Sequence, residues 1–163
     1  MPTVKEKKST SPTARNEAQE ATVLLQADHE RVSDLFAEYE KADSTAEKKQ
    51  IVDQLCNELT VHTQIEEEIF YPTVKLALKD KKLIPEARVE HATLKALIAQ
   101  VEGVEPKGEM FDAKIKVMQE YVKHHVKEEQ NEIFPKAKST GLDMEELGAK
   151  LFKRKKELLA ARS

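Results

Sequence analysis

Apolar side chains recur at spacings of three and four residues along most of the chain, which is the period of an amphipathic α-helix. The first helix is expected to start near Ala14. Its apolar stripe consists of Val23, Leu24, Ala27, Val32, Leu35, Phe36 and Tyr39. Residues 1–13 are rich in Lys, Ser, Thr and Pro and show no such period, so we expect a disordered N-terminal tail there. No segment shows the period of two that predicts a half-buried strand.

Signals for helix starts and ends divide the rest of the chain. Ser44 and Glu47 form a capping box that opens a second helix. Pro72 should kink or end that helix, with residues 74–78 as a further turn or two. The later helices are predicted over 85–103, 108–135 and 143–161.

This pattern predicts an all-α fold. Residues 14–140 are expected to form an up-and-down, antiparallel four-helix bundle, because its four long helices are joined by short connections. Residues 141–163 are expected to add a C-terminal helix that packs on the bundle or extends it.

Composition agrees with one domain and limits its environment. The chain has 163 residues, of which 39% are hydrophobic and 35% charged, and this is enough for one proper core. It contains neither the ~18 consecutive apolar residues of a membrane span nor the apolar region of a signal peptide. Its one cysteine, Cys56, excludes a disulfide framework and suits a reducing compartment. We therefore expect a soluble, cytoplasmic protein with no membrane partner.

The net charge of −3 is unevenly distributed. Residues 1–15 carry +3 and residues 150–163 carry +5, which leaves −11 for the residues between them. An acidic body with short basic ends is a poor footprint for a nucleic-acid groove, so no nucleic-acid partner is expected. The basic C-terminal segment is interpreted as a solvated helical face.

Histidine and glutamate repeat in register in the two halves of the chain. His62 precedes Glu66 by four residues, and His125 precedes Glu129 by four, so each pair lies on one helix face. Each of these histidines also begins a segment that ends in a proline ten residues later, HTQIEEEIFYP in the first half and HVKEEQNEIFP in the second.

Two further histidines complete the repeat. His29 follows Asp28 in the first helix, and His91 follows Glu90 in the third. Folding the two halves as a bundle brings four imidazoles and two carboxylates together in its interior. A buried, unpaired carboxylate is very costly, and a bound cation would remove that cost. The predicted metal ligands are His29, His62, Glu66, His91, His125 and Glu129.

The remaining histidine, His124, falls outside this register and is interpreted as a solvated histidine or one that supports a ligand. Six ligands exceed the four of a structural zinc site, and no thiolate competes with them. Imidazole and carboxylate ligands drawn in pairs from facing helices suit two iron or manganese ions bridged by the carboxylates. Two iron ions are the leading interpretation, and two zinc ions or a single metal ion are the alternatives.

These segments closely resemble the hemerythrin-like domain with the HHE cation-binding pattern. The resemblance covers roughly residues 20–140 and rests on DHERV at His29, HTQIEEEIFYP at His62, EHATLKALI at His91 and HHVKEEQNEIFP near His125. It implies a four-helix bundle that holds a non-haem di-iron centre with an oxo or hydroxo bridge. By the same resemblance, the four histidines would be terminal ligands and the two glutamates would bridge the irons.

The chain departs from the oxygen-carrying members of that family. Those members have a further histidine one turn after the third-helix ligand, where this chain has Lys95, and an aspartate five residues after the last histidine, where it has Glu129 at four. Each iron would then have five ligands and could keep an open or water-filled position, which favours reaction with small oxidants such as peroxide. Alternatively, Glu58 or Tyr121, each one turn before a ligand pair, fills the gap. Tyr121 could also donate a hydrogen bond to a bound oxygen species.

Three functions agree with such a centre. The leading prediction is binding of, and reaction with, O₂ or hydrogen peroxide, which includes a catalase-like or peroxidase-like activity. Reversible binding of O₂ or NO for storage or sensing is the alternative. Iron handling is a third, which is disfavoured because the family members so used carry a cysteine-bearing N-terminal domain and residues 1–20 contain no cysteine.

Overall fold

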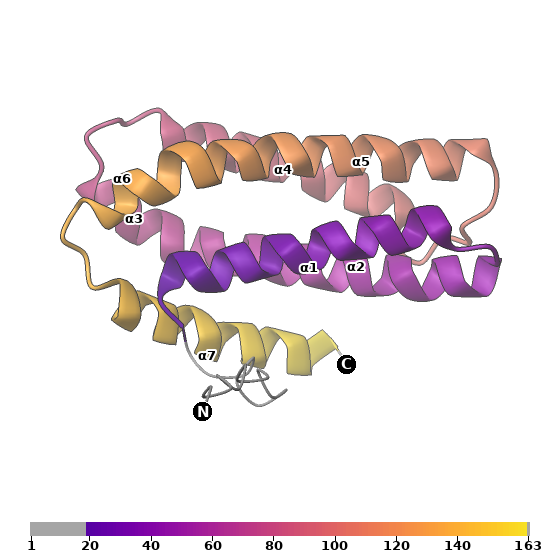
Figure 1. The fold of residues 1–163 in the computed structure, drawn as a ribbon, viewed down its shortest axis with the longest axis horizontal. Coiled ribbons are helices and arrows are strands. Elements are labelled where there is room, and N and C mark those ends of the chain that lie inside the picture. The colour runs from indigo at the N-terminus through magenta and orange to yellow at the C-terminus, as the bar shows by residue number, and fades with distance from the viewer. Residues whose placement is uncertain (1–18, 163) are drawn as a thin grey trace, which may run out of the picture.

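The computed structural model describes residues 19–162, and every regular element in that range is a helix (Figure 1). The expected tail over 1–13 and the expected helix start near Ala14 lie outside the described residues. The first described helix begins at Ala21, where the Glu20 side chain accepts a hydrogen bond from the Thr22 amide. None of the described helices combines the length and the apolar content that a bilayer-spanning helix needs.

Four long helical runs form the up-and-down, antiparallel bundle that the sequence predicts, with a further helix added after them. The runs are α1 (Ala21–Lys41); α2 (Thr45–Ile65) with η2 (Glu66–Phe70) and α3 (Tyr71–Ala77); α4 (Leu83–Val101); and α5 (Glu109–Glu128) with η3 (Glu129–Ile133) and α6 (Phe134–Lys138). The predicted helix start at Ser44 is confirmed, because Ser44 Oγ accepts a hydrogen bond from the Glu47 amide at 3.1 Å; this is the N-cap half of the expected capping box.

The prolines neither end nor interrupt their helical runs. Pro72 was expected to kink or end the second helix, but the chain passes through it into α3, and the run continues past Pro135 in the same way. The five residues before Tyr71 and before Phe134 form π-helices, η2 and η3. In each, the amide next to the proline reaches back five residues, from Tyr71 to the Glu66 carbonyl and from Phe134 to the Glu129 carbonyl. The widened turns therefore accommodate the prolines, and they start at the two predicted bridging glutamates.

The hydrophobic core is divided into two layers. The α7 layer lies toward α7 (Met144–Arg162) and includes Leu25, Ile65, Phe70, Ile84, Ile133 and Leu151. The loop layer lies toward the 42–44 and 102–108 connections and includes Val32, Leu35, Leu59, Leu94 and Ile115. On α1 the change from one layer to the other falls at His29, and each of the other runs changes layer at its own histidine. The histidines thus form a buried polar level between two apolar ones.

Helix α7 packs on α1, α2 and η2, beside the bundle (Figure 1). Its buried side is formed by Leu147, Gly148 and Leu151. A Cβ atom at Gly148 would lie 1.8 Å from the Gln19 carbonyl oxygen, so only glycine allows this approach of α7 to the segment that leads into α1.

Replacing Gly148 with alanine is expected to lower the free energy of unfolding by about 2 kcal/mol, because the added methyl group collides with backbone atoms and must displace α7. Urea denaturation followed by circular dichroism measures the change. The control is Ala149→Ser at the exposed neighbouring position, which should change the value by less than about 0.5 kcal/mol. Equal effects of the two substitutions would contradict this packing.

Candidate metal centre

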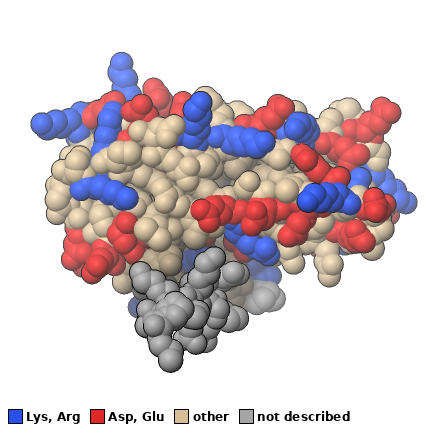
Figure 2. All heavy atoms as spheres, in the orientation of Figure 1, with Lys and Arg blue, Asp and Glu red and all other residues tan. Residues whose placement is uncertain are grey.

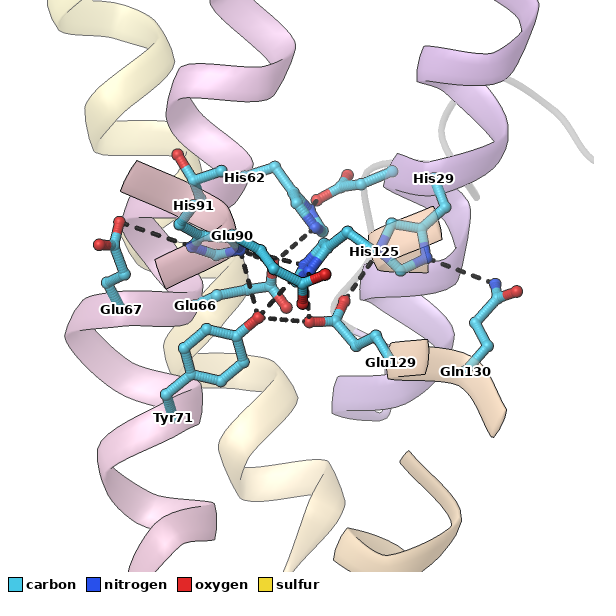
Figure 3. A network of polar contacts seen from close by, with 12 residues as sticks. His29, His62, Glu66, Glu67, Tyr71, Glu90, His91, His125, Glu129 and Gln130 are labelled. Carbon is cyan, nitrogen blue, oxygen red and sulfur yellow. Dashed lines mark hydrogen bonds and ion pairs between the residues drawn. The ribbon is translucent and has the colours of Figure 1, made fainter. Parts of the chain in front are cut away.

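The structure brings the six predicted ligands together in one buried cluster between the two apolar layers (Figure 3). Each helical run supplies one histidine, and each π-helix supplies one glutamate as its first residue. The glutamates are 0% exposed and no histidine of the cluster is more than 7% exposed. The members are His29, His62, Glu66, His91, His125 and Glu129.

The ligand atoms form two groups that share one residue. The first group is Glu66, His91, His125 and Glu129, and the second is His29, His62 and Glu129, with one ligand atom of each residue within 4.8 Å of the others. The ring centroids are 4.9 Å apart for the histidines of the first half of the chain and 4.8 Å apart for those of the second half. Each half of the repeat therefore supplies the histidine pair of one group.

Glu129 reaches both histidine pairs with different oxygens. Its Oε1 is 3.0 Å from His29 Nε2, and its Oε2 is 3.4 Å from His125 Nε2. Burial alone would raise the pKa of Glu129, but contacts with Glu66, His125 and His29 hold the pKa well below its usual range. The group is thus an ionised carboxylate that lies between the two pairs, which is the position that a bridging ligand needs.

Glu66 lies between the pairs through a single oxygen. Its Oε1 is 2.8 Å from His62 Nε2 and 3.4 Å from His91 Nε2. Apart from these ion-pair contacts within the cluster, neither of its oxygens has a hydrogen bond, and the same holds for His29 Nε2, His62 Nε2 and Glu129 Oε1. Buried polar atoms without partners are rare and costly in folded proteins. Since all of these atoms converge on the interior of the cluster, imidazole nitrogens and carboxylate oxygens are here a fitting donor set for metal cations.

The outer nitrogen of each imidazole lies next to a side chain that is not itself in the cluster. The distances from Nδ1 are 2.8 Å for His62 to Asp28, 3.2 Å for His125 to Glu90, 3.7 Å for His91 to Glu67 and 3.3 Å for His29 to Gln130. Metal-binding histidines are commonly held by an outer N–H donated to an acceptor, so that Nε2 faces the metal. Asp28 and Glu90 offer such acceptors within hydrogen-bond distance. Glu67 forms a longer ion pair with His91 Nδ1, and Gln130 presents its amide nitrogen to His29 Nδ1.

These supporting side chains follow the repeat. The acid before the first histidine of each half supports the second histidine of the same half, as Asp28 does for His62. The residue after each cluster glutamate supports the first histidine of the other half, as Glu67 does for His91. The sequence has these supporting residues at equivalent positions of its two halves, but which histidine each of them contacts depends on how the helices face one another.

The electrostatic effects agree with these contacts. Burial lowers the pKa of His125, but Glu129 and Glu90 raise it to about 10. The pKa of His62 is likewise raised well above its usual value, because Glu66 and Asp28 outweigh burial. Without a metal, the cluster would therefore retain protons on its imidazoles to balance the carboxylates.

The tyrosine that contacts the cluster is Tyr71, which sequence reasoning missed. Its hydroxyl donates a hydrogen bond to Glu129 Oε2 at 2.5 Å and lies 3.2 Å from His91 Nε2 and 3.4 Å from His125 Nε2. Burial and the neighbouring carboxylates raise its pKa well above the usual value, so the phenol keeps its proton. Tyr121 is half-buried on α5 and has no hydrogen bond or ring contact within residues 19–162.

The other residues that the sequence analysis singled out near the ligand positions lie outside the cluster. Lys95 is half-exposed, and its Nζ is 2.6 Å from Glu67 Oε2. Glu58 is half-buried on α2 and makes no ion pair or hydrogen bond within the described range. His124 is 63% exposed and lies 3.3 Å from Glu128, in agreement with its interpretation as a solvated histidine.

A small cavity adjoins the cluster. It measures about 20 Å³, room for roughly one water-sized molecule, and its walls are the four histidines with valine, leucine and threonine side chains. A larger cleft of about 280 Å³ is lined by α1, α5 and η3. The cavity and the cleft share His29, Val122 and Val126 as lining residues, so these side chains border both spaces.

The basic C-terminal segment differs from the solvated face that was expected. Three of its cations form ion pairs with the bundle: Lys155 with Asp28, Arg154 with Glu68 and Arg162 with Glu102. On the face shown in Figure 2, basic and acidic side chains are interspersed, and no single basic patch covers it.

Comparison with known proteins agrees with this geometry. One crystal structure, of a hemerythrin HHE cation binding domain-containing protein (the Rv2633c homolog from Mycobacterium kansasii), has the same fold. Its TM-score is 0.77 at 22% identity, over 88% of this chain and 89% of that one.

A DNA nickase from Nostoc sp. (strain PCC 7120) is 25% identical over 111 residues, which is 68% of this chain but only 31% of that protein's length. The profile of the hemerythrin HHE cation binding domain matches residues 20–137. The chain therefore belongs to the hemerythrin HHE cation-binding family, and its buried histidine and glutamate groups support metal binding.

Proposed function

We propose that the cluster holds two iron ions and that the protein binds and reacts with O₂ or hydrogen peroxide there. The observation that carries the proposal is the pair of buried ligand groups that share Glu129, with unpartnered nitrogen and oxygen atoms converging between them. His29 and His62 would hold one ion, and His91 and His125 the other. Glu66 and Glu129 would bridge the two.

The chemistry of the donor set favours iron. Four imidazoles and two carboxylates that could bridge give each ion two nitrogens and two oxygens, and pairs of ions held between such carboxylates in helical bundles suit iron or manganese. The only cysteine, Cys56, belongs to the loop layer, so the cluster contains no thiolate. Zinc and manganese remain the alternatives that metal analysis will distinguish.

An iron pair, when bound, supplies two-electron redox chemistry to a small oxidant. The protein's own groups prepare the site for it. Asp28 and Glu90 orient the imidazoles of His62 and His125, and the apolar side chains of the cavity wall exclude bulk water and limit the size of a ligand. The Tyr71 hydroxyl oxygen lies 2.5 Å from Glu129 Oε2 and donates its hydrogen bond within the cluster.

The two sides of the cluster offer different access. The Tyr71 hydroxyl occupies the side of His91 and His125. On the other side, the ring of Phe134 stacks on His29 at 5.8 Å and has no polar atom, and His29 also lines the cleft. We therefore place the exchangeable ligand position on the side of His29 and His62.

Reversible binding of O₂ or NO is the second candidate function, and the apolar cavity of about 20 Å³ favours it because a neutral diatomic molecule fits there. The optical spectrum of the reduced, iron-loaded protein on addition of O₂ or peroxide separates the two functions. Sustained peroxide consumption supports the reactive centre. A stable O₂ adduct over many cycles, with no peroxide consumption, supports the carrier.

Purified protein reconstituted with iron is expected to hold about two iron ions per chain, because two ligand groups share the bridging carboxylates. Removal of one imidazole ligand by His125→Ala should lower the iron content. His124→Ala removes the exposed neighbouring histidine and should leave the content unchanged. Iron content is measured by elemental analysis, and one zinc ion that persists through iron reconstitution would refute the proposal.

Tyr71→Phe removes the hydroxyl that contacts Glu129 and should change both the optical spectrum of the iron-loaded protein and its rate with peroxide. The free energy of unfolding should fall by about 1–3 kcal/mol, because a buried acceptor loses its partner. Tyr121→Phe is the matched control and should change none of these quantities. If Tyr121→Phe changed these quantities and Tyr71→Phe did not, Tyr121 would be the tyrosine that acts at the cluster.

The metal-free protein should lose stability as the pH rises from about 6.5 to about 10. The pKa of His125 is about 10 in the folded state, so its stabilisation is complete below the unfolded pKa near 6.5 and is lost as the pH passes through the folded pKa. In the loaded protein the metal takes the place of the proton, and the decline should be smaller. Denaturant unfolding with and without bound metal measures the difference, and parallel curves would contradict the coupling.

A further inference from the structure

Helix α7 lies beyond residues 20–137, the part of the chain that matches the family, yet it contacts the support of a cluster histidine. Lys155 Nζ is 2.5 Å from Asp28 Oδ1, and Asp28 Oδ2 is 2.8 Å from His62 Nδ1. The same imidazole presents Nε2 to Glu66 Oε1 at 2.8 Å. A continuous series of polar contacts thus runs from α7 to the centre of the cluster.

The packing of α7 fixes the position of Lys155. Leu151 is fully buried, and Lys155 follows it by four residues, so both side chains lie on the face of α7 that is turned to the bundle. Arg154 pairs with Glu68 of η2 at 2.7 Å, which ties α7 to the segment that carries Glu66. The Lys155 side chain is only 24% exposed, unlike that of a freely solvated lysine.

Asp28 needs a cation at this place. Its side chain is 4% exposed, and within the described residues Lys155 is the only hydrogen-bond partner of its Oδ1. A buried carboxylate without a counter-charge is costly, and it attracts the proton of a neighbouring imidazole more strongly. With Lys155 present, the negative charge of Asp28 is shared, and the carboxylate is held with Oδ2 against His62 Nδ1 while His62 Nε2 faces the centre.

The equivalent support in the second half of the chain lacks this cation. Glu90 holds His125 Nδ1 at 3.2 Å, and its other oxygen faces the exposed His124 at 3.5 Å. Lys155 is therefore a difference between the two halves that arises from α7 and not from the repeat.

We propose that Lys155 is a positioning residue of the metal centre, which acts through Asp28 to fix the orientation of His62 and to make this imidazole a weaker electron donor than His125. The part of the inference that concerns metal rests on the function proposed above. By this proposal, α7 contributes a residue that affects the metal centre.

Lys155→Met keeps the length of the side chain and removes the charge. The dissociation constant of this variant for Co²⁺, measured by competition with a chelator, is expected to fall about tenfold, because a positive charge near the cation is lost and Asp28 makes His62 a stronger donor. In the iron-loaded protein the reduction potential should shift to more negative values, because a positive charge near the metal pair is lost. Lys155→Arg should restore both quantities toward wild type.

The matched control is Lys153→Met, which removes an equal charge from an exposed position on the same helix. It should leave both the affinity and the potential unchanged. Asp28→Asn provides a second test that does not depend on α7, because Lys155→Met should have little further effect in that background. The proposal is overturned if Lys155→Met behaves like Lys153→Met, or if the effects of Lys155→Met and Asp28→Asn are additive.

A measurement on the metal-free protein separates this inference from the proposed function. Wild type should show an exchange-protected Nδ1–H proton of His62 by NMR, and Lys155→Met should make its exchange with water about tenfold faster. If wild type binds no metal, the proposed function fails, while this result still supports the Lys155–Asp28–His62 contact. Equal protection in the two proteins would overturn the contact even where metal binding is normal.

Discussion

Two fully buried glutamates in the middle of a helical bundle are the constraint on which the rest of the structure depends. Glu66 and Glu129 are both 0% exposed and lie between two apolar layers that cannot solvate their charge. The four imidazoles around them are needed to hold that charge in place. This arrangement is expensive for a protein that only needs a stable bundle, because apolar residues of similar volume would pack there without unpaired atoms. The buried negative charge is explained if it serves to bind a cation.

The π-helices solve a geometric difficulty that this constraint creates. A glutamate four residues after a histidine lies on the same helix face, but the chain must then turn its next residues toward the α7 layer and pass a proline. The widened turn that starts at each glutamate adds the residue that this change requires. One result is that Tyr71 and Phe134 lie against the rings of His91 and His29, although each comes just before a proline.

The sequence was enough to predict the bundle, the N-cap at Ser44 and the residues that meet in the cluster, because burial and charge pairing both follow helix faces. It was not enough to choose between Tyr71 and Tyr121. Tyr121 shares a helix face with His125, but it lies toward the loop layer, while Tyr71 reaches the cluster only because η2 shifts the register. The contact of Lys155 could not be predicted for a related reason: it depends on how α7 docks, which helical periodicity does not define.

The repeat makes the two halves alike, and the exceptions to it make them different. Tyr71 and Phe134 occupy equivalent positions in the two halves, as do Glu67 and Gln130. The hydroxyl of Tyr71 and the charge of Glu67 lie next to His91, whereas Phe134 and Gln130 lie next to His29. On the other side, Lys155 balances Asp28. The proposed ion between His91 and His125 would therefore have the more anionic surroundings, and the ion at His62 the less anionic. A pair of identical ions in such a site cannot have identical potentials, because the electrostatic field of the protein differs at the two positions. The chemistry of the centre thus depends on the residues that break the repeat as much as on those that form it.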